Sequence, residues 1–217
     1  MFSVFNAGYP GENTRQLLLR FEKGVRSCEP DCVVLMAGTN DFLNSHNMIS
    51  AGEYRSNILQ LIARCRETGA RVILCGIPDA NETLMLSRHK PGFFAECSAR
   101  KRIASCYAIL QEIADTENLP FLNTVQILGK ATCEKDSLFR NELNSGAADG
   151  VHPTPEGYAR LAAAVCAEIR KLTPHPRRIV CLGDSITYGV HVKGAGTVDI
   201  NAENYPGKLR NLLSKEK

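Results

Sequence analysis

A serine, a histidine and an aspartate in this sequence have the types and spacing that nucleophilic catalysis requires. Ser185 ends a Gly-Asp-Ser turn that follows an apolar run, and Asp149 lies three residues before His152 in one polar segment. A serine nucleophile needs a base to take its proton and a carboxylate to orient that base. The spacing lets Asp149 reach a ring nitrogen of His152 within a single loop. The three residues therefore predict a catalytic triad with Ser185 as nucleophile, His152 as base and Asp149 as third member.

Polar groups near the triad could stabilise the oxyanion that forms when a serine attacks a carbonyl carbon. Such a site needs preorganised N–H donors. The predicted donors are the backbone N–H groups of Ser185 and Gly8 and the side-chain amide of Asn40. A glycine at position 8 lets an acyl group approach the main chain closely. Asp184 and Asp41 adjoin these donors, and we expect them to form hydrogen bonds within their turns and to the residues that surround the site.

Each of these residues, taken alone, also has an ordinary structural explanation. The Gly-Asp-Ser turn could merely cap the segment that follows it, and Asn40 and Asp41 could form Asx turns. His152 could be a surface histidine, and Asp149 could form a turn with Gly150. The prediction of a site therefore depends on whether the fold brings the polar segments together.

The pattern of apolar residues predicts the elements that would position these side chains. Short apolar runs bounded by Gly, Pro or Asn are typical of strands buried on both faces of a parallel sheet. They are residues 2–6, 32–37, 71–77, 121–125 and 178–182. Amphipathic stripes predict helices at residues 17–25, 54–65, 103–113, 158–172 and 204–213. This alternation predicts an α/β fold, a three-layer α/β/α sandwich with a flavodoxin-like parallel sheet, in which ligands bind at the carboxyl ends of the strands.

The composition is that of a folded domain with nearly balanced charge. The 217 residues include 26 basic and 23 acidic residues, and 44% are hydrophobic. Length and composition predict a single domain spanning residues 1–217. Because the basic residues are scattered among acidic neighbours, nucleic acid is not an expected partner. The apolar runs are shorter than the ~20 residues of a membrane span, and the first residues lack a secretion signal, so a cytoplasmic location is expected.

Nine cysteines could indicate disulfides or a metal site. The number is odd, and several cysteines lie in predicted strands or helices, where the thiol behaves as a small buried apolar group. These are Cys32, Cys75, Cys106, Cys166 and Cys181. Cys28 and Cys32 form the closest pair, but no second pair or histidine follows at zinc-ligand spacing. The sequence therefore predicts neither a metal nor a cofactor.

The four polar segments together closely resemble the sequence blocks of the SGNH family, also called GDSL hydrolases. The blocks match residues 183–187, 6–11, 38–41 and 149–153. The resemblance covers nearly the whole chain. It implies the triad described above, with Ser185, Gly8 and Asn40 as oxyanion donors.

The order of the blocks departs from that of the family. In the family the serine block comes first and the Asp-x-x-His block last, whereas here the serine block follows the histidine block. The chain is therefore predicted to be a circularly permuted SGNH hydrolase, with the junction at about 173–177. In that arrangement the first strand is an edge strand paired in parallel with the strand at 178–182. Met1 and Lys217 would then lie near each other, opposite the site.

The resemblance implies a serine ester hydrolase, an esterase or acylhydrolase that works through an acyl-enzyme on Ser185. The expected substrate is a small-molecule acyl or acetyl ester, a class that includes esters of carbohydrates and lipids. The alternatives are a transacylase and a non-catalytic binding module on the same scaffold, and the intact triad disfavours the second. A phosphate-binding loop at Gly8 and Gly11 is disfavoured because the segment lacks the Lys-Ser/Thr ending of a P-loop.

Two longer segments, residues 79–102 and 129–148, are candidates for determining specificity. The first mixes apolar with basic side chains, which suits a lid or an acyl-binding wall with a basic rim. A packed surface excursion explains it equally well.

Overall fold

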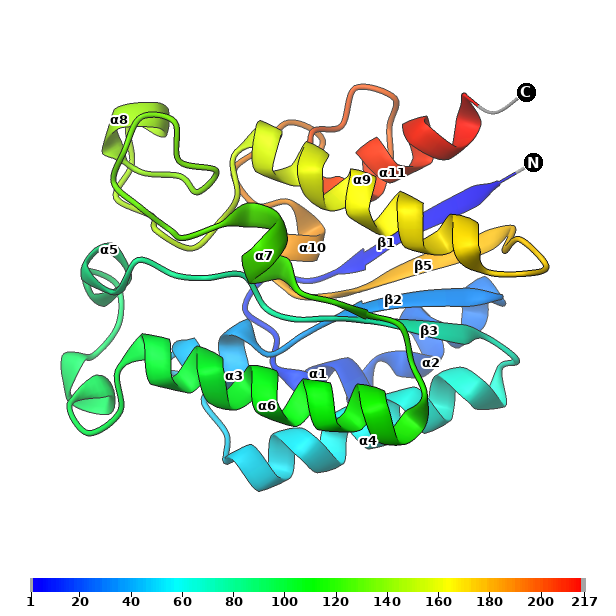
Figure 1. Cartoon of the computed structure of the whole chain (residues 1–217), viewed down its shortest axis with the longest axis horizontal. Coiled ribbons are helices and arrows are strands. Elements are labelled where there is room, and N and C mark those ends of the chain that lie inside the picture. The colour runs from blue at the N-terminus through cyan, green and yellow to red at the C-terminus, as the bar shows by residue number, and fades with distance from the viewer. Residues whose placement is uncertain (1, 216–217) are drawn as a thin grey trace.

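Five parallel strands form the centre of the protein (Figure 1). The computed structural model describes residues 2–215. The strands are β1 (Ser3–Gly8), β2 (Cys32–Met36), β3 (Arg71–Cys75), β4 (Phe121–Leu122) and β5 (Arg178–Gly183). Their order across the sheet is β1-β5-β2-β3-β4, and every pairing is parallel. The parallel sheet predicted from the apolar runs is confirmed.

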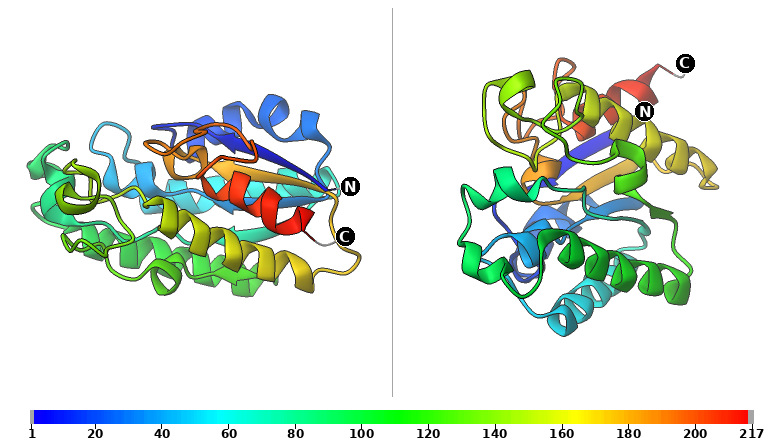
Figure 2. Two further views of the ribbon diagram at one scale, coloured as in Figure 1. Left: turned by 90° about the horizontal axis from the view of Figure 1, so that it is seen from above. Right: turned by 60° about the vertical axis from the view of Figure 1, so that its left-hand side comes forward.

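Helices cover both faces of the sheet and produce three layers (Figures 1 and 2). One face carries α1 (Thr14–Leu19), α2 (Phe21–Gly24), α4 (Ala51–Glu67) and α6 (Ala99–Glu117). The other carries α7 (Thr124–Leu128), α9 (Pro155–Lys171) and α11 (Tyr205–Ser214). The shorter helices are α3 (Thr39–Leu43), α5 (Glu82–Leu86), α8 (Glu142–Ser145) and α10 (Ser185–Tyr188), with 3-10 turns at Arg26–Cys28 and Pro91–Phe94. The predicted α/β/α sandwich is therefore confirmed.

Side chains of each strand alternate between the two faces. In β2, Val33 and Leu35 belong to the core under α4 and α6, whereas Val34 and Met36 belong to the core under α9 and α11. All are buried. Because both faces are covered by helices, both sets of side chains are apolar, which is why the strands read as continuous apolar runs. The cysteines predicted to be buried are also buried, namely Cys32, Cys75, Cys106, Cys166 and Cys181.

Two of the predicted elements take a different form in the structure. The strand predicted at 121–125 ends before Asn123, whose side chain accepts a hydrogen bond from Gln126 N–H and starts α7. An asparagine in this position favours the start of a helix over continuation of a strand. The helix predicted at 17–25 is two short helices, α1 and α2, which meet at Arg20.

β1 is an edge strand paired with β5, although the two strands lie near opposite ends of the chain. Ser3 lies opposite Arg178, and Gly8 lies opposite Gly183. The backbone N–H of Ser3 also donates to the carbonyl oxygen of Arg177 (2.7 Å). The predicted pairing of the first strand with the last strand is confirmed.

The beginning of β1 and the end of α11 lie at the same end of the sheet (Figure 2). Phe2, His175 and Leu213 line one cavity of about 310 Å³ there. Met1 and Lys217, which were predicted to be neighbours, lie outside the described residues. These positions agree with a permuted order of blocks, and the permutation itself stays a prediction.

Candidate active site

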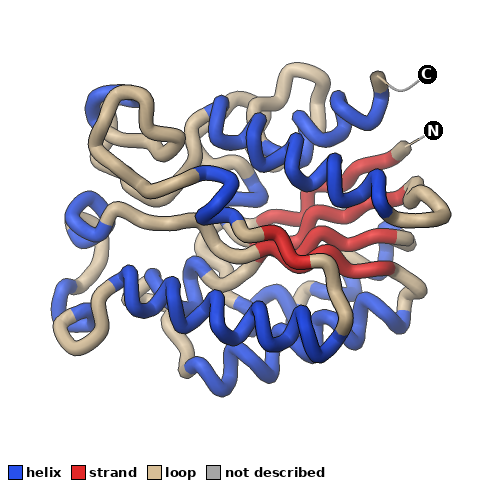
Figure 3. The backbone as a smooth tube through the Cα atoms, viewed as in Figure 1, coloured by secondary structure: helices blue, strands red, loops and turns tan. Residues whose placement is uncertain are grey.

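The polar segments meet at the carboxyl ends of β1, β5 and β2, where loops and short helices gather (Figure 3). Ser185 Oγ lies 3.0 Å from His152 Nε2. His152 Nδ1 lies 2.9 Å from Oδ2 and 3.0 Å from Oδ1 of Asp149. The backbone N–H of His152 also donates to Asp149 Oδ1 (2.9 Å). The three side chains form one continuous hydrogen-bonded chain with distances suited to proton transfer.

Ser185 and His152 line a cavity of about 290 Å³, which we call the Ser185 cavity. Its polar wall contains Gly11, Thr39, Asn40, Asn44, Arg88, His89 and His191. Its apolar wall contains Pro10, Leu43, Met85, Val151 and Val190. The cavity combines apolar walls with a few converging polar groups, as small-molecule sites do.

Ser185 is presented by the turn between β5 and α10. The Asp184 carboxylate accepts a hydrogen bond from Ile186 N–H (2.9 Å) and caps α10. Complete burial raises the pKa of Asp184 to about 6. This is the hydrogen bond within the turn that the sequence leads us to expect of Asp184.

Gly8 does not take the position predicted for it. Its N–H donates to Asn6 Oδ1 (3.0 Å), and Gly8 is not among the residues that line the Ser185 cavity. A Cβ atom at this position would overlap the main chain of Tyr188. Glycine is therefore needed so that α10 can pack against β1. The expectation that Gly8 donates to an oxyanion is corrected.

Gly11 lies in the wall of the Ser185 cavity instead. Pro10 and Gly11 are the central residues of a turn in which Glu12 N–H donates to the Tyr9 carbonyl oxygen (3.4 Å), and Gly11 has a φ of +79°. This pattern is typical of a type II turn, which requires glycine at the second central position. The Gly11 N–H has no acceptor within residues 2–215. The Pro-Gly pair was the signal in the sequence for this turn.

Asn40 also lines the Ser185 cavity, and its amide is held in place at both ends. Its Nδ2 donates to the carbonyl oxygen of Glu12 (2.8 Å), and its Oδ1 accepts from Asn44 Nδ2 (2.9 Å). One N–H of the Asn40 amide remains for a further acceptor. The backbone N–H of Ser185 likewise has no acceptor in the described part of the chain. The cavity therefore offers N–H donors from Ser185, Gly11 and Asn40.

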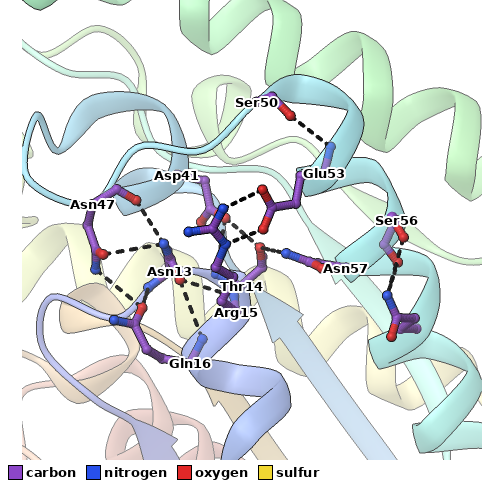
Figure 4. A network of polar contacts seen from close by, with 11 residues as sticks. Asn13, Thr14, Arg15, Gln16, Asp41, Asn47, Ser50, Glu53, Ser56 and Asn57 are labelled. Atoms are coloured by element: carbon purple, nitrogen blue, oxygen red, sulfur yellow. Dashed lines mark hydrogen bonds and ion pairs between the residues drawn. The ribbon is translucent and has the colours of Figure 1, made fainter.

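A buried polar network ties α3, which carries Asn40, to α1 (Figure 4). Asp41 Oδ1 accepts from the backbone N–H of Thr14 (3.0 Å) and from its hydroxyl (2.5 Å). Asn57 Nδ2 donates to the same hydroxyl oxygen (3.0 Å). Burial raises the pKa of Asp41 to about 6, against the lowering effect of the Thr14 hydrogen bonds. Asp41 thus connects two helices rather than facing the cavity.

Asn13 and Asn47 of the same network (Figure 4) also hold the loop that carries Gly11. Asn47 Nδ2 donates to the Gly11 carbonyl oxygen (2.7 Å). Asn13 Nδ2 donates in turn to the Asn47 carbonyl oxygen (2.8 Å), while Asn13 Oδ1 caps α1. The Gly11 carbonyl oxygen is therefore held by a side chain, whereas its N–H has no acceptor within residues 2–215.

Asp149 is buried but stays ionised. Burial alone would raise its pKa, but hydrogen bonds and charge from His152 and the backbone N–H of Val151 hold the pKa of Asp149 well below its usual value. Arg88 adds a cation, because its Nη2 donates to the Asp149 carbonyl oxygen (2.6 Å) and lies 3.3 Å from Oδ1. A charged carboxylate can keep the proton of His152 on Nδ1, which leaves Nε2 free to accept the Ser185 proton.

The two longer segments have different relations to the site. Residues 79–102 contribute Met85, Arg88 and His89 to the Ser185 cavity, so this segment forms part of its wall. Residues 129–148 contribute no lining residue to it. Arg140, from this second segment, donates its N–H to the His152 carbonyl oxygen (2.9 Å) and so supports the histidine loop.

A larger cavity of about 710 Å³ lies between residues 79–83, α6 and α7. None of the triad residues lines it, and its carboxylates at Asp79 and Glu82 accept hydrogen bonds from the backbone N–H groups of Ala131 (3.0 Å) and Ala99 (3.1 Å). Size alone therefore does not identify the reactive site. The smaller Ser185 cavity is the better candidate because the hydrogen-bonded Ser185 and His152 side chains line it.

An open parallel α/β sheet with a Ser-His-Asp chain at its carboxyl edge defines the class of α/β serine hydrolases. Residues 2–160 match the model of the GDSL-like Lipase/Acylhydrolase family. The chain belongs to that family, and the protein is a hydrolase of the esterase and acylhydrolase type. The matched range ends before β5, so Ser185 lies outside it.

Several proteins are similar over most of the chain. A Bacillus subtilis protein named "Uncharacterized lipoprotein YqeF" is 28% identical over 171 residues, which are 71% of this chain and 68% of the relative. A GDSL-like lipase from Bacteroides thetaiotaomicron is 28% identical with a TM-score of 0.59, covering 74% of this chain and 72% of that one. A lipase/acylhydrolase from Enterococcus faecalis is 26% identical with a TM-score of 0.54, covering 75% and 72%.

The expectation of a cytoplasmic location is corrected by these comparisons, because the Bacillus subtilis relative is named a lipoprotein. That expectation was based on the short apolar runs and on the first residues of the chain. Within residues 2–215, no helix combines the length and the apolar character that crossing a bilayer requires.

Proposed function

We propose that the protein hydrolyses small-molecule esters through an acyl-enzyme formed on Ser185. The observation that carries the proposal is the chain of contacts from Ser185 Oγ to His152 Nε2 (3.0 Å) and from His152 Nδ1 to Asp149 Oδ2 (2.9 Å). Membership of an esterase and acylhydrolase family supports the reaction class.

In the first half of the reaction, Ser185 Oγ attacks the carbonyl carbon of the ester while His152 Nε2 takes the hydroxyl proton. Asp149 stabilises the imidazolium that results. The carbonyl oxygen becomes an oxyanion and accepts hydrogen bonds from the N–H groups of Ser185, Gly11 and Asn40. His152 then gives its proton to the departing alkoxide, and the acyl group remains on Ser185.

In the second half, water replaces the alcohol. His152 takes a proton from the water, the hydroxide attacks the acyl carbon, and the carboxylic acid leaves as the proton returns to Ser185 Oγ. The order of events is symmetric because the same base serves both halves. An alcohol that binds better than water would receive the acyl group instead, which is the transacylase alternative.

We further propose that residues 1–217 form one domain in which the SGNH blocks occur in circularly permuted order, joined at about 173–177. The pairing of β1 with β5 supports this proposal. Core residues from both ends of the chain also support it, since Val4 and Leu213 belong to the same buried cluster.

The test combines covalent labelling with a substrate screen. A fluorophosphonate probe should label the protein once, on the peptide that contains Ser185, and p-nitrophenyl acetate should be hydrolysed. The matched control is Ser185→Ala, which removes one hydroxyl and little packing. Equal labelling of the two proteins would refute the assignment of the nucleophile. A screen from acetate to palmitate esters, run with acetylated sugars and an acyl-CoA, would identify the acyl and alcohol groups.

A further inference from the structure

His191 is a second imidazole beside the triad, and the proposed hydrolysis does not use it. It lies in the loop after α10, and its ring meets that of His152 edge to face with centroids 5.3 Å apart. Its Nε2 lies 3.7 Å from Asp149 Oδ2. That distance is too long for a hydrogen bond. The His191 side chain is 49% exposed, while that of Asp149 is 4% exposed, so His191 can be reached from solvent.

The three side chains have the donor types and the spacing of a metal-ligand set. His152, Asp149 and His191 each offer one ligand atom, and these atoms all lie within 4.8 Å of one another. Asp149 Oδ2 lies 2.9 Å from His152 Nδ1 and 3.7 Å from His191 Nε2. These distances are a little shorter and a little longer than the distance between two ligand atoms on a tetrahedral zinc ion. That separation is roughly 3.4 Å for bonds of about 2.0–2.1 Å, and imidazole and carboxylate are ligands that zinc accepts. We propose that His152, Asp149 and His191 bind Zn²⁺, with water as the fourth ligand, and that the bound ion inhibits the hydrolase.

The surroundings of His191 favour this geometry. Its φ of +70° is uncommon for a residue other than glycine. Arg140 Nη1 donates to the His191 carbonyl oxygen (3.3 Å) and helps to hold that main chain. Arg88 approaches Oδ1 of Asp149, which leaves Oδ2 on the side of His191. The two nearby arginines repel a cation, so we expect reversible binding that is weaker than that of a structural zinc site.

Metal binding has a definite consequence for the base. Zinc takes the lone pair of Nδ1, so the single proton of the neutral His152 ring must move from Nδ1 to Nε2 through solvent. Nε2 then donates a hydrogen bond to Ser185 Oγ and cannot accept its proton. The protein gains only the zinc ion and its bound water, and its number of protons does not change. This inhibition rests on the proposed hydrolase mechanism, whereas binding of the ion does not.

Binding is tested without activity by titrating the Ser185→Ala protein with Co²⁺, which replaces zinc and absorbs visible light when it is tetrahedral. We expect the tetrahedral absorption to saturate at about one equivalent and to be lost when His191→Asn is added. Asparagine suits the positive φ at this position, so the main chain should be retained. His175→Asn, at the opposite end of the sheet, is the matched control and should keep the signal. Absorption that persists without His191, or a thiolate charge-transfer band in its place, would overturn the site.

Inhibition is tested by measuring p-nitrophenyl acetate hydrolysis against ZnCl₂, each variant relative to its own metal-free rate. Zinc should inhibit the natural sequence, and EDTA should restore the rate. The inhibition constant should rise at least ~10-fold in His191→Asn and stay unchanged in His175→Asn. Equal inhibition with and without His191 would overturn the proposed inhibition. A protein with no esterase activity would refute the proposed function, and the Co²⁺ titration would still decide the metal site.

Discussion

The two ends of the sheet use the same type of side chain for different purposes. At the carboxyl ends, Asp149 contacts His152 Nδ1 at 2.9 Å. At the amino ends, Asp31 accepts hydrogen bonds from the backbone N–H groups of Arg177 (2.8 Å) and Arg178 (2.9 Å). The Asp149 carboxylate orients a ring nitrogen beside the proposed nucleophile, whereas the Asp31 carboxylate holds the main chain at the start of β5.

This difference shows that the position of a polar residue in the fold decides its role more than its type does. Loops at the carboxyl ends of parallel strands meet in a crevice, and here that crevice is the Ser185 cavity. Changes at the carboxyl ends should therefore alter reaction rates. Changes at the amino ends should leave the rates alone, provided that the fold survives.

The largest expected effect at the carboxyl ends comes from removing the base. His152→Ala should lower kcat by on the order of 10⁶-fold, because without a base the serine proton has no acceptor. Rates at saturating p-nitrophenyl acetate check this. A His152→Ala protein with most of its activity would remove the triad assignment.

The next largest effect should come from Asp149→Asn. The amide can no longer hold the proton of His152 on Nδ1, and a loss of about 10⁴-fold in kcat is expected. Asp31→Asn is the matched control at the other end of the sheet, and its kcat should be unchanged. A comparable loss of kcat in both variants would abolish the distinction between the two ends.

Removing one oxyanion donor should cost less. Asn40→Ala should lower kcat by about 10²- to 10³-fold and leave KM almost unchanged, because the hydrogen bond strengthens only as negative charge develops. The neighbouring Asn44→Ala, which removes the partner of Asn40 Oδ1, should have a smaller effect. An Asn40 variant with raised KM and normal kcat would mean that the amide binds substrate in its ground state.

Asp184→Asn should change the pH dependence of stability. Burial raises the pKa of Asp184 from 3.8 to about 6, so the folded state holds this proton more tightly than the unfolded state does. The resulting stabilisation is complete below pH 3.8 and is lost as the pH rises through 6. Urea unfolding at pH 5 and pH 7.5 should show a smaller difference in Asp184→Asn than in the natural sequence. The exposed Asp199→Asn serves as control, and an unchanged difference in Asp184→Asn would contradict the account.

The smallest effect is expected at the amino ends, from changing the order of the chain. Joining the two termini with a short Gly/Ser linker and opening the chain at Pro174 should yield a folded protein with similar kcat/KM. The reason is that Phe2, His175 and Leu213 share one cavity far from Ser185. Circular dichroism and p-nitrophenyl acetate kinetics would check this. A folded permutant with little activity would show that the junction influences the site.

The contacts that join Ser185, His152 and Asp149 were predictable because these residues carry strong local signals. Asp149 and His152 lie within one loop, so their contact needs almost no knowledge of the fold. Ser185 is marked by its turn after an apolar strand. The choice of Gly8 over Gly11 failed because both glycines occur in the same short segment. Only the packing of Tyr188 against Gly8 separates a glycine needed for close approach from one that faces a cavity.

Arg88 and His191 lie outside any motif and could not be assigned from the sequence. Arg88 is 61 residues from Asp149 along the chain, and its contact depends on how α5 is placed over the histidine loop. His191 meets His152 only because the loop after α10 turns back toward the cavity. Contacts of this kind are set by the sum of many packing interactions, none of which has a sequence signature of its own.

By itself, the sequence determined the fold class, the buried strands and the chemical types that gather at one edge of the sheet. These follow from the periodicity of apolar residues and from turn residues, which act over a few positions. The tertiary structure alone decided which glycine lines the cavity, which arginine approaches the Asp149 carboxylate, and that a second histidine lies beside the first. The physical reason is that orientation within a site depends on distances between segments, and close packing of the whole core sets those distances.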